Sequence, residues 1–303
     1  MPAQPRLAFY AWPKPFTKPH IATIQRNAIR SWQLLEPRPD IMLFGNDPGI
    51  AEAAQELGVQ HIPEGPPLVD SVPRVKDLAA AAEQLSSAPF LCFINADIIL
   101  TQSFVEGVAK AAPLGRFLLG ASPWDTDVPE MVEYGPGWEE KLRARAYAAN
   151  CLRPRHSADF IAHPRGFLID APEVLAGRWY VDNGLMWFAR KSGAALIDGT
   201  SGILTIHQSH DYGHLGQFEK RHMDSEGAIW NLRCIGGDWH LYTWSNATHT
   251  YSAAGVQPYP AGRMAVWPTH PSFKRLNAVH GFIARGTRTF RGLLGMRRNP
   301  RSI

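Results

Sequence analysis

Two polar residues, Asn95 and Asp97, interrupt an apolar run between Phe90 and Leu100. A run that is apolar on both faces predicts a strand buried inside a parallel sheet. Open α/β sheets bind ligands at the carboxyl ends of such strands, so we expect both side chains at that edge. A carboxylate among apolar neighbours needs a partner such as a metal ion. The alternative is that Asp97 caps the turn after the strand.

A second group of chemistry-bearing residues lies between His207 and His214, where three histidines and Asp211 fall within eight residues. Neutral imidazole is a common ligand of divalent metals, and a carboxylate suits Mg²⁺ or Mn²⁺. His207 directly follows the apolar run 203–206, so a strand should aim it into the site. We therefore rank His207 above His210 and His214 as a ligand. The alternative is a turn whose histidines make structural hydrogen bonds.

A third candidate, Asp182, lies between aromatic residues and an apolar stretch, in the segment from Arg178 to Trp187. Burial beside aromatic rings would raise the pKa of this carboxyl towards the range that is useful for a general base. The alternative is a helix N-cap at Asp182 or Asn183, and the two roles can coexist.

Further polar residues near the predicted elements could contact a nucleotide. A carboxylate after the strand at 41–44 could hold a ribose or base, and cations that open the helix before the Phe90 strand could face a diphosphate. Solvated surface charge is the alternative for these charged residues. The candidates for this contact are Tyr10, Asp47, Arg74, Lys76 and Asn95. The sequence contains no Walker A motif and no nucleophile-elbow motif.

The elements that must position these residues alternate along the first third of the chain. Strands are predicted at residues 7–12, 41–44, 59–62 and from 90, and helices at 21–35, 50–57 and 75–85. This order is typical of a parallel nucleotide-binding sheet. We expect a loop at 63–73, a further strand at 117–121 and an irregular region at 124–172.

The charges and cysteines limit the class of protein. Eight of the 31 Lys and Arg residues lie between Lys274 and Arg301, which leaves 23 against 27 acidic residues elsewhere. A mildly acidic body argues against a nucleic-acid binder, so we expect no nucleic-acid partner. The three cysteines are far apart, no secretory signal begins the chain and no apolar run could span a bilayer. We expect a cytoplasmic protein.

The motifs together resemble a bacterial family of glycosyltransferases with the GT-A-type, nucleotide-diphospho-sugar transferase fold. The matching stretches are 20–32, 41–45, 95–100, 182–183, 207–214 and 236–240. The resemblance implies an α/β fold with a Rossmann-type, mostly parallel sheet flanked by helices and an irregular acceptor-side region. It covers most of the chain, from about residue 7 to residue 250.

The resemblance also implies an activity, which is transfer of a sugar from a nucleotide-diphospho-sugar to a glycan or other hydroxyl acceptor. A divalent ion, Mn²⁺ or Mg²⁺, would bridge the diphosphate. Asp97 matches the final, metal-binding Asp of the family's motif, and Asp182 falls where inverting members carry the catalytic base. A C-terminal metal ligand falls in the 207–214 block, where we expect His207 and His210.

The sequence departs from the family pattern at three places. Asn95 replaces the first Asp of the metal motif, which implies weaker metal binding or a dispensable metal. Val181 and Gly184 flank the 182–183 pair where the family has Trp, and Ser209 stands where Asn is expected. These changes affect donor fit and acceptor geometry more than the fold.

Two other functions are compatible with the same residues. A metal-dependent hydrolase could use the His207 to His214 block alone, and Asn95 makes a catalytically inactive nucleotide-sugar-binding protein conceivable. Within the transferase interpretation we expect one catalytic domain over residues 1–254. Its nucleotide-binding half would be 1–112 and its acceptor and metal half 113–254.

A linker and the basic tail would follow over residues 255–303. Apolar residues in the tail recur near helical spacing between the cations. Such a segment could rest on an anionic membrane, which would make the protein peripheral on the inner face of the membrane. The alternative is a tail whose charges face water.

Overall fold

The computed structural model describes residues 4–69, 71–210 and 225–259. Residues 1–262 form one compact unit, and residues 263–303 form a second unit that lies outside the described range. The basic tail, Asp211 and His214 are therefore also outside the described residues. Along the described chain no helix is long and apolar enough to cross a membrane.

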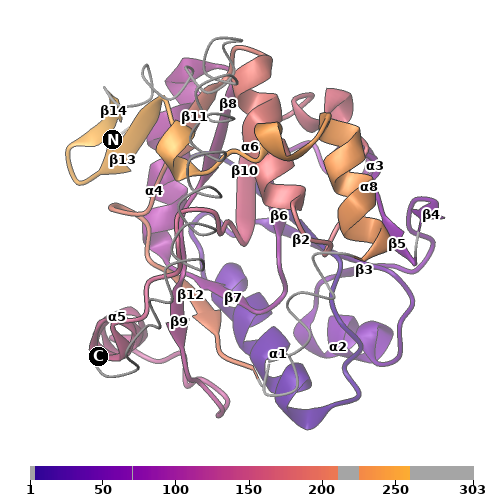
Figure 1. The fold of residues 1–303 in the computed structure, drawn as a ribbon. Helices are drawn as coiled ribbons and strands as arrows, with labels where there is room; N and C mark the ends of the chain where they lie inside the picture. The colour runs from indigo at the N-terminus through magenta and orange to yellow at the C-terminus, as the bar shows by residue number, and fades with distance from the viewer. Residues whose placement is uncertain (1–3, 70, 211–224, 260–303) are drawn as a thin grey trace, which may run out of the picture. The chain divides into compact units, whose positions relative to one another are not determined.

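A nine-stranded sheet forms the centre of the first unit, in the order β14-β13-β11-β8-β10-β6-β1-β2-β3 (Figure 1). In chain order its strands are β1 (Leu7–Ala11), β2 (Asp40–Phe44), β3 (Gln60–Ile62), β6 (Phe90–Ile94), β8 (Phe117–Gly120), β10 (Phe160–Pro164), β11 (Ala195–Asp198), β13 (His249–Ser252) and β14 (Gly255–Pro258). Only β10 and β14 run antiparallel to their neighbours in this sheet. The prediction of an α/β fold with a mostly parallel sheet is confirmed.

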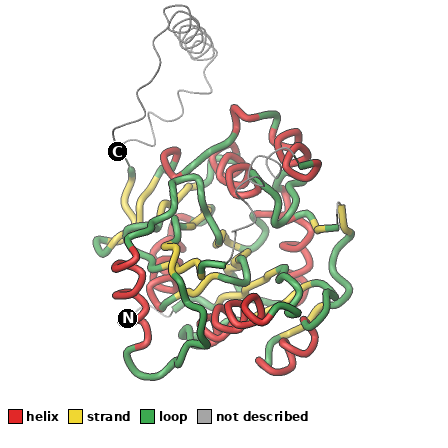
Figure 2. Tube along the Cα trace, turned by 60° about the horizontal axis from the view of Figure 1, so that its bottom comes forward, coloured by secondary structure: helices red, strands yellow, loops and turns green. Residues whose placement is uncertain are grey.

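Helices cover both faces of this sheet. Neighbouring residues on a strand point to opposite faces, so each strand contacts both layers of helices. Phe9 of β1 packs against Trp32 and Phe104, with ring centroids 5.6 and 5.4 Å away. Tyr10 belongs to the core on the opposite face. The first face is covered by α1 (Pro19–Gln33), α2 (Ile50–Leu57) and α4 (Gln102–Ala111), and the second by α3 (Val75–Leu85), α6 (Val181–Lys191) and α8 (Glu226–Ile235). Figure 2 shows helices around the central strands.

Local sequence signals explain several element bounds. The helices α2 and α3 begin and end where the periodicity predicts. Gly58 ends α2 in the left-handed conformation with φ of 62°, which a glycine adopts without steric cost. Pro19 opens α1 in its first turn, where a missing backbone N–H costs nothing.

A second, three-stranded sheet in the order β7-β12-β9 lies between α1 and α5 (Trp138–Ala149) in Figure 1. Its strands are β7 (Ile98–Leu100), β9 (Trp124–Thr126) and β12 (Thr205–Gln208). The middle strand β12 is antiparallel to β7 and parallel to β9. The apolar run from Phe90 is thus divided, because the chain leaves the central sheet after Ile94 and enters the second sheet at Ile98.

The region 124–172 is more regular than the sequence predicts. It contains β9, α5 and β10, and β10 lies between β6 and β8 in the central sheet. The helix α5 escapes periodicity analysis because it buries only Leu142 and Ala146. The loop predicted at 63–73 holds a small hairpin of β4 (Leu68–Val69) and β5 (Val72–Pro73).

The remaining short elements connect these layers. Short 3-10 helices are η1 (Ala112–Leu114), η2 (Leu168–Asp170), η3 (Asp238–His240) and η4 (Trp244–Asn246). The strand β14 pairs with β13 from residue 255 onward, so a boundary drawn at residue 254 divides a hairpin.

Candidate metal centre

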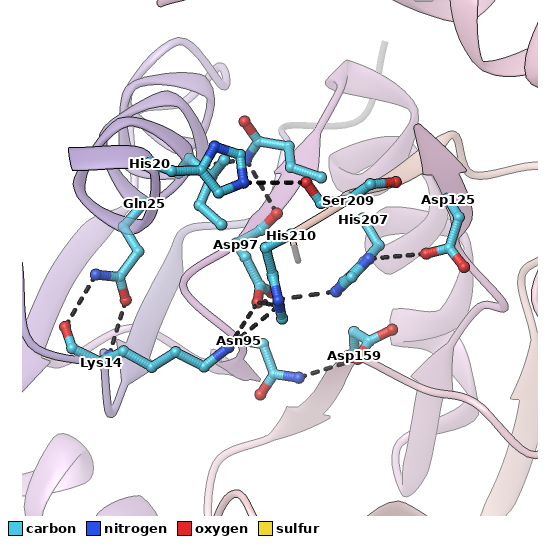
Figure 3. Close-up of polar contacts among 12 residues, drawn as sticks. Lys14, His20, Gln25, Asn95, Asp97, Asp125, Asp159, His207, Ser209 and His210 are labelled. Atoms are coloured by element: carbon cyan, nitrogen blue, oxygen red, sulfur yellow. Dashed lines mark hydrogen bonds and ion pairs between the residues drawn. The ribbon is translucent and has the colours of Figure 1, made fainter. Parts of the chain in front are cut away.

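Asp97, His207 and His210 meet at the carboxyl end of β6 (Figure 3). One donor atom from each side chain lies within 4.8 Å of the others. Oδ2 of Asp97 is 3.3 Å from Nε2 of His210 and 3.8 Å from Nε2 of His207. The second sheet brings them together, because β7 begins directly after Asp97 and pairs with β12, with Ile98 opposite His207.

The donor set fits a divalent cation. The side chains of Asp97 and His207 are 10% and 2% exposed, so water hardly screens the electrostatic interaction between them. Oδ1 of Asp97 is buried and has no hydrogen-bond partner among the described residues. A buried polar atom without a partner is costly, and a cation beside it would remove that cost. Carboxylate oxygen with imidazole nitrogen suits Mn²⁺ and similar ions.

Asp125 orients the imidazole of His207. Asp125 and His207 are register partners on β9 and β12, and Oδ1 of Asp125 lies 2.8 Å from Nδ1 of His207. A proton on Nδ1 would be donated to this carboxylate, which leaves the lone pair on Nε2 for a ligand role. Burial opposes ionisation of Asp125, but contacts with His207 and Arg153 outweigh it and lower its pKa. The site thus has the carboxylate–histidine arrangement typical of protein metal centres.

The protonation states also suit metal binding. Burial opposes the charge on Asp97, but its contact with His210 and its electrostatic interactions with His207 and Lys14 outweigh this and hold the pKa of Asp97 well below its ordinary value. Burial lowers the pKa of His210, which favours the neutral imidazole that a metal requires. Near neutral pH Asp97 is therefore an anion, and His210 is a neutral imidazole that can donate a lone pair to a metal.

Two cationic side chains adjoin the cluster. Nζ of Lys14 is 3.6 Å from Oδ2 of Asp97 and 3.2 Å from Nε2 of His210. Nη2 of Arg153 is 3.4 Å from Nε2 of His207. Arg153 also bonds Asp125 at 2.8 Å and Asp159 at 3.2 Å, which fixes its guanidinium. The cluster is thus flanked by two positively charged side chains, which could attract an anionic ligand.

Asn95 faces a different partner from Asp97. Its Nδ2 donates to Oδ1 of Asp159 at 3.0 Å, and its backbone N–H donates to the carbonyl of Asp159. Asp159 is also paired with Arg153. Asn95 therefore serves as a donor that holds Asp159, a task that a carboxylate at position 95 could not perform because ionised Asp is acceptor-only.

Asp182 lies in the first turn of α6 and is electrostatically coupled to Asp159. Burial raises the pKa of Asp182 well above its ordinary value, and the negative charge of Asp159 adds to this, against a hydrogen bond from the backbone of Ala158. The N-cap alternative is not what the structure shows. Tyr180, with φ of 72°, is the N-cap residue, and no side chain of the described residues caps the helix.

The remaining candidate contacts are less closely gathered. Tyr10 is fully buried, and its hydroxyl lies 2.8 Å from Nε2 of His163, so it is not exposed to a ligand here. Asp47 is exposed just after β2. Arg74 and Lys76 form ion pairs with Glu173 at 3.5 and 3.1 Å. Of the residues predicted for nucleotide contact, Asn95 is the one that joins the network around the candidate metal centre.

Four polar residues of this site were not found from the sequence, namely Lys14, Asp125, Arg153 and Asp159. Three of them belong to the region 124–172, where the periodicity is weak. Their positions depend on pairing between strands about 80 residues apart, such as β9 with β12. The residue pattern within one segment does not predict the register in which two distant strands pair.

No protein-family model and no curated protein matches the chain. Solved structures are similar to it at low identity. Glucosyl-3-phosphoglycerate synthase from Mycobacterium tuberculosis in complex with Mn²⁺, UDP and glucosyl-3-phosphoglycerate has a TM-score of 0.45 and 17% identity, over 77% of this chain and 81% of that one. Another structure of that synthase has a TM-score of 0.43 and 16% identity, over 86% and 92% of the two chains. A mycobacterial protein has a TM-score of 0.44 and 14% identity, over 77% and 76%.

Proposed function

We propose that the protein transfers a sugar from a nucleotide-diphospho-sugar to a hydroxyl acceptor with the help of a divalent metal. The observation that carries the proposal is the buried cluster of Asp97, His207 and His210 at the carboxyl edge of a parallel sheet. This edge is where open α/β sheets bind their ligands. The resemblance of the motifs to GT-A-type transferases points to the same reaction.

Asp97, His207 and His210 would hold Mn²⁺ or Mg²⁺, and the bound ion would supply positive charge to the departing nucleoside diphosphate. Lys14 and Arg153 lie within 3.6 Å of these ligand atoms, so they can neutralise further phosphate charge. Asn95 and Arg153 hold Asp159, whose charge also acts on Asp182. Asp47, Arg74 and Lys76 remain predicted donor contacts.

Asp182 is the proposed general base. Its raised pKa brings the carboxyl closer to the operating pH, where proton transfer from an acceptor hydroxyl is most efficient. Its position in the first turn of α6 places the carboxylate near the positive end of the helix dipole, which favours the ionised form that accepts the proton. Trp179, which is 38% exposed and precedes Asp182 by three residues, is the proposed apolar contact for the acceptor.

The proposal is tested by incubating the protein with a panel of UDP- and GDP-sugars, with and without Mn²⁺, and measuring free nucleotide. We expect slow release that requires Mn²⁺ and one donor, and faster release once a hydroxyl acceptor is added. Asp97→Ala should abolish it, and Asp127→Ala, at an exposed position two residues beyond Asp125, should not.

Other outcomes would select the alternative functions. Metal-dependent hydrolysis of simple phosphate or carboxylic esters, without any nucleotide-sugar turnover, would show a hydrolase. Donor binding that raises the melting temperature while no nucleotide is ever released would show a binding protein without catalysis.

A further inference from the structure

We infer that Lys14 is an exchangeable cation of the candidate metal centre. Its ammonium holds the position of the ion when the metal is absent, and a divalent ion displaces it. The displaced ammonium is then available to the diphosphate of the donor. This inference rests on the metal site of the proposed function and adds to it a residue that couples metal binding to donor binding.

The position of the ammonium carries the argument (Figure 3). Nζ lies 3.2 Å from Nε2 of His210 and 3.6 Å from Oδ2 of Asp97, which are two of the three proposed ligand atoms. A metal needs the lone pair of that nitrogen and an oxygen of that carboxylate. Whichever tautomer His210 adopts, the ammonium stands beside both atoms. Lys14 in this position and a bound divalent ion exclude each other by charge.

The ammonium group of Lys14 can move while its backbone stays fixed. Gln25, which is buried, bonds the backbone of Lys14 twice, with Oε1 accepting from its N–H at 2.8 Å and Nε2 donating to its carbonyl at 2.9 Å. Pro13 and Pro15 flank the residue and restrict the chain further. The side chain itself is 53% exposed, and its Nζ contacts Asp97 and His210.

Arg153, the other cation at the cluster, is held differently. It forms ion pairs with two carboxylates, Asp125 and Asp159, and its side chain is 20% exposed. Moving it would break two ion pairs in a partly buried network, and that is costly. Among the described residues Lys14 pairs with one carboxylate, Asp97, which the metal itself would neutralise. Lys14 is therefore the cation whose departure costs less.

Charge balance gives the consequence for ligand binding. A divalent ion that enters while Lys14 stays adds two positive charges to a site whose Asp97 is already neutralised. The ion and the ammonium would then repel each other. A diphosphate would draw the ammonium away from the ion and relieve this repulsion, so the nucleotide-sugar donor and the metal should favour each other's binding. Without the ammonium, metal alone should bind more tightly, and the diphosphate should add less.

Calorimetric titration with Mn²⁺ tests this in the full-length chain, its Lys14→Met variant and its Lys18→Met variant. Lys18 is an exposed lysine four residues along that forms no ion pair in the described residues, so it controls for general charge. We expect Lys14→Met to bind Mn²⁺ at least about tenfold more tightly than the other two proteins. Repeating the titration with saturating UDP or GDP should give the variant a smaller gain in Mn²⁺ affinity than the parent.

A second measurement uses the unaltered protein and so does not depend on the folding of a variant. Amine-reactive ester labelling, read by mass spectrometry, should increase at Lys14 when Mn²⁺ is added and stay constant at Lys18. Labelling at Lys14 that is unchanged or lower with Mn²⁺ overturns the inference.

The outcomes also separate this inference from the proposed function. If the parent binds Mn²⁺ and Asp97→Ala does not, but Lys14→Met matches Lys18→Met, then Lys14 is not exchangeable and the metal site stands. If the parent binds no Mn²⁺, or if Asp97→Ala binds it equally well, the metal site and the role of Lys14 are both wrong.

Discussion

Asn95 and Asp97 are two residues apart and take part in different contacts. Asn95 donates to Asp159, whereas Asp97 faces His207 and His210. The only carboxylate of this pair therefore lies at the candidate metal centre, and the second carboxylate near the metal ligands is Asp125, which bonds Nδ1 of His207. At this scale the site depends on one anionic ligand and on a carboxylate that orients an imidazole.

We expect Asp125→Asn to weaken Mn²⁺ binding by about 10- to 100-fold, because loss of a carboxylate that orients a ligating histidine typically has this effect. The protein should stay folded, since Asp125 lies in the second, three-stranded sheet and is part-exposed. Mn²⁺ titration measures the change, with Asp127→Asn as the matched control. Equal affinity in the two variants would remove Asp125 from the site.

Asp182→Asn should keep donor binding and lose most of the transfer, because the amide preserves the shape and cannot accept the proton. In the parent, kcat/KM should fall as the pH is lowered through the raised pKa of Asp182, since the base must be ionised. Near-parental turnover of the variant at saturating acceptor would show that another group is the base.

The same variant has a predicted effect on stability. A carboxyl whose native pKa is raised binds more protons in the native state than in the unfolded state, so it destabilises the protein as the pH rises above its ordinary pKa. Asp182→Asn should therefore unfold at a higher temperature than the parent at neutral pH, and the difference should shrink in acid. Thermal melts at several pH values measure it.

At the scale of elements, the second sheet and α1 are connected by buried amides. Nε2 of Gln208, which follows His207 in β12, donates to the carbonyls of Ile24 at 2.7 Å and Asp97 at 3.0 Å. Its Oε1 accepts from Nδ2 of Asn27 at 3.0 Å. One side chain thus fixes β12 against both α1 and the turn that carries Asp97.

Gln208→Met should destabilise the protein by about 3 kcal/mol, because it fills a similar volume and leaves buried carbonyls without donors. It should also weaken Mn²⁺ binding, since the turn at Asp97 loses its anchor. Urea unfolding gives the stability, and Gln55→Met, on the exposed face of α2, is the control. A variant as stable as this control would contradict the role given to Gln208.

At the scale of the whole molecule, a buried polar pair connects β1 to β10 within the central core. The hydroxyl of Tyr10 lies 2.8 Å from Nε2 of His163, and Nδ1 of His163 lies 3.0 Å from the carbonyl of Pro164. Both rings are fully buried. Burial lowers the pKa of His163 to about 4, so the folded protein holds it as a neutral imidazole.

This pair makes the free energy of unfolding depend on pH. In the unfolded chain His163 binds a proton once the pH falls below its ordinary pKa of 6.5. In the folded chain it stays neutral until the pH falls to its lowered pKa of about 4. Stability should therefore fall with decreasing pH in this window, by about 3 kcal/mol from this group.

His163→Gln should be less stable than the parent at pH 7 but lose less stability on acidification. Denaturant unfolding at pH 7 and pH 5 tests this, with the exposed His156→Gln as control. The same loss on acidification in both variants would show that His163 titrates as an exposed group.

The tail remains a prediction at this scale, because residues 274–301 lie outside the described part of the chain. Each Lys or Arg near an anionic membrane contributes about 1 kcal/mol of attraction, and salt screens it. We expect weak, salt-sensitive sedimentation with phosphatidylserine-containing vesicles that is lost on deletion of residues 274–303. Equal sedimentation of both proteins at low salt would exclude the tail as the contact.

The sequence by itself determined the elements whose signals are local. The apolar run from Phe90 predicts a buried strand, and β6 is one, with Asp97 just beyond its carboxyl end. The run 203–206 predicts a strand that carries His207 into the interior, where its side chain is 2% exposed. Helices α2 and α3 follow from periodicity with Gly58 as a stop signal. Each of these depends on neighbours within one turn or one strand.

Only the tertiary structure decided which distant residues meet. The antiparallel strand β10 lies between β6 and β8, although no pattern in its five residues specifies those neighbours. The contacts of Lys14 with His210 and of Asp125 with His207 join segments separated by 196 and about 80 residues. The physical reason is that side-chain alternation fixes which face of a strand is buried, whereas its partner and register are set by packing across the whole sheet.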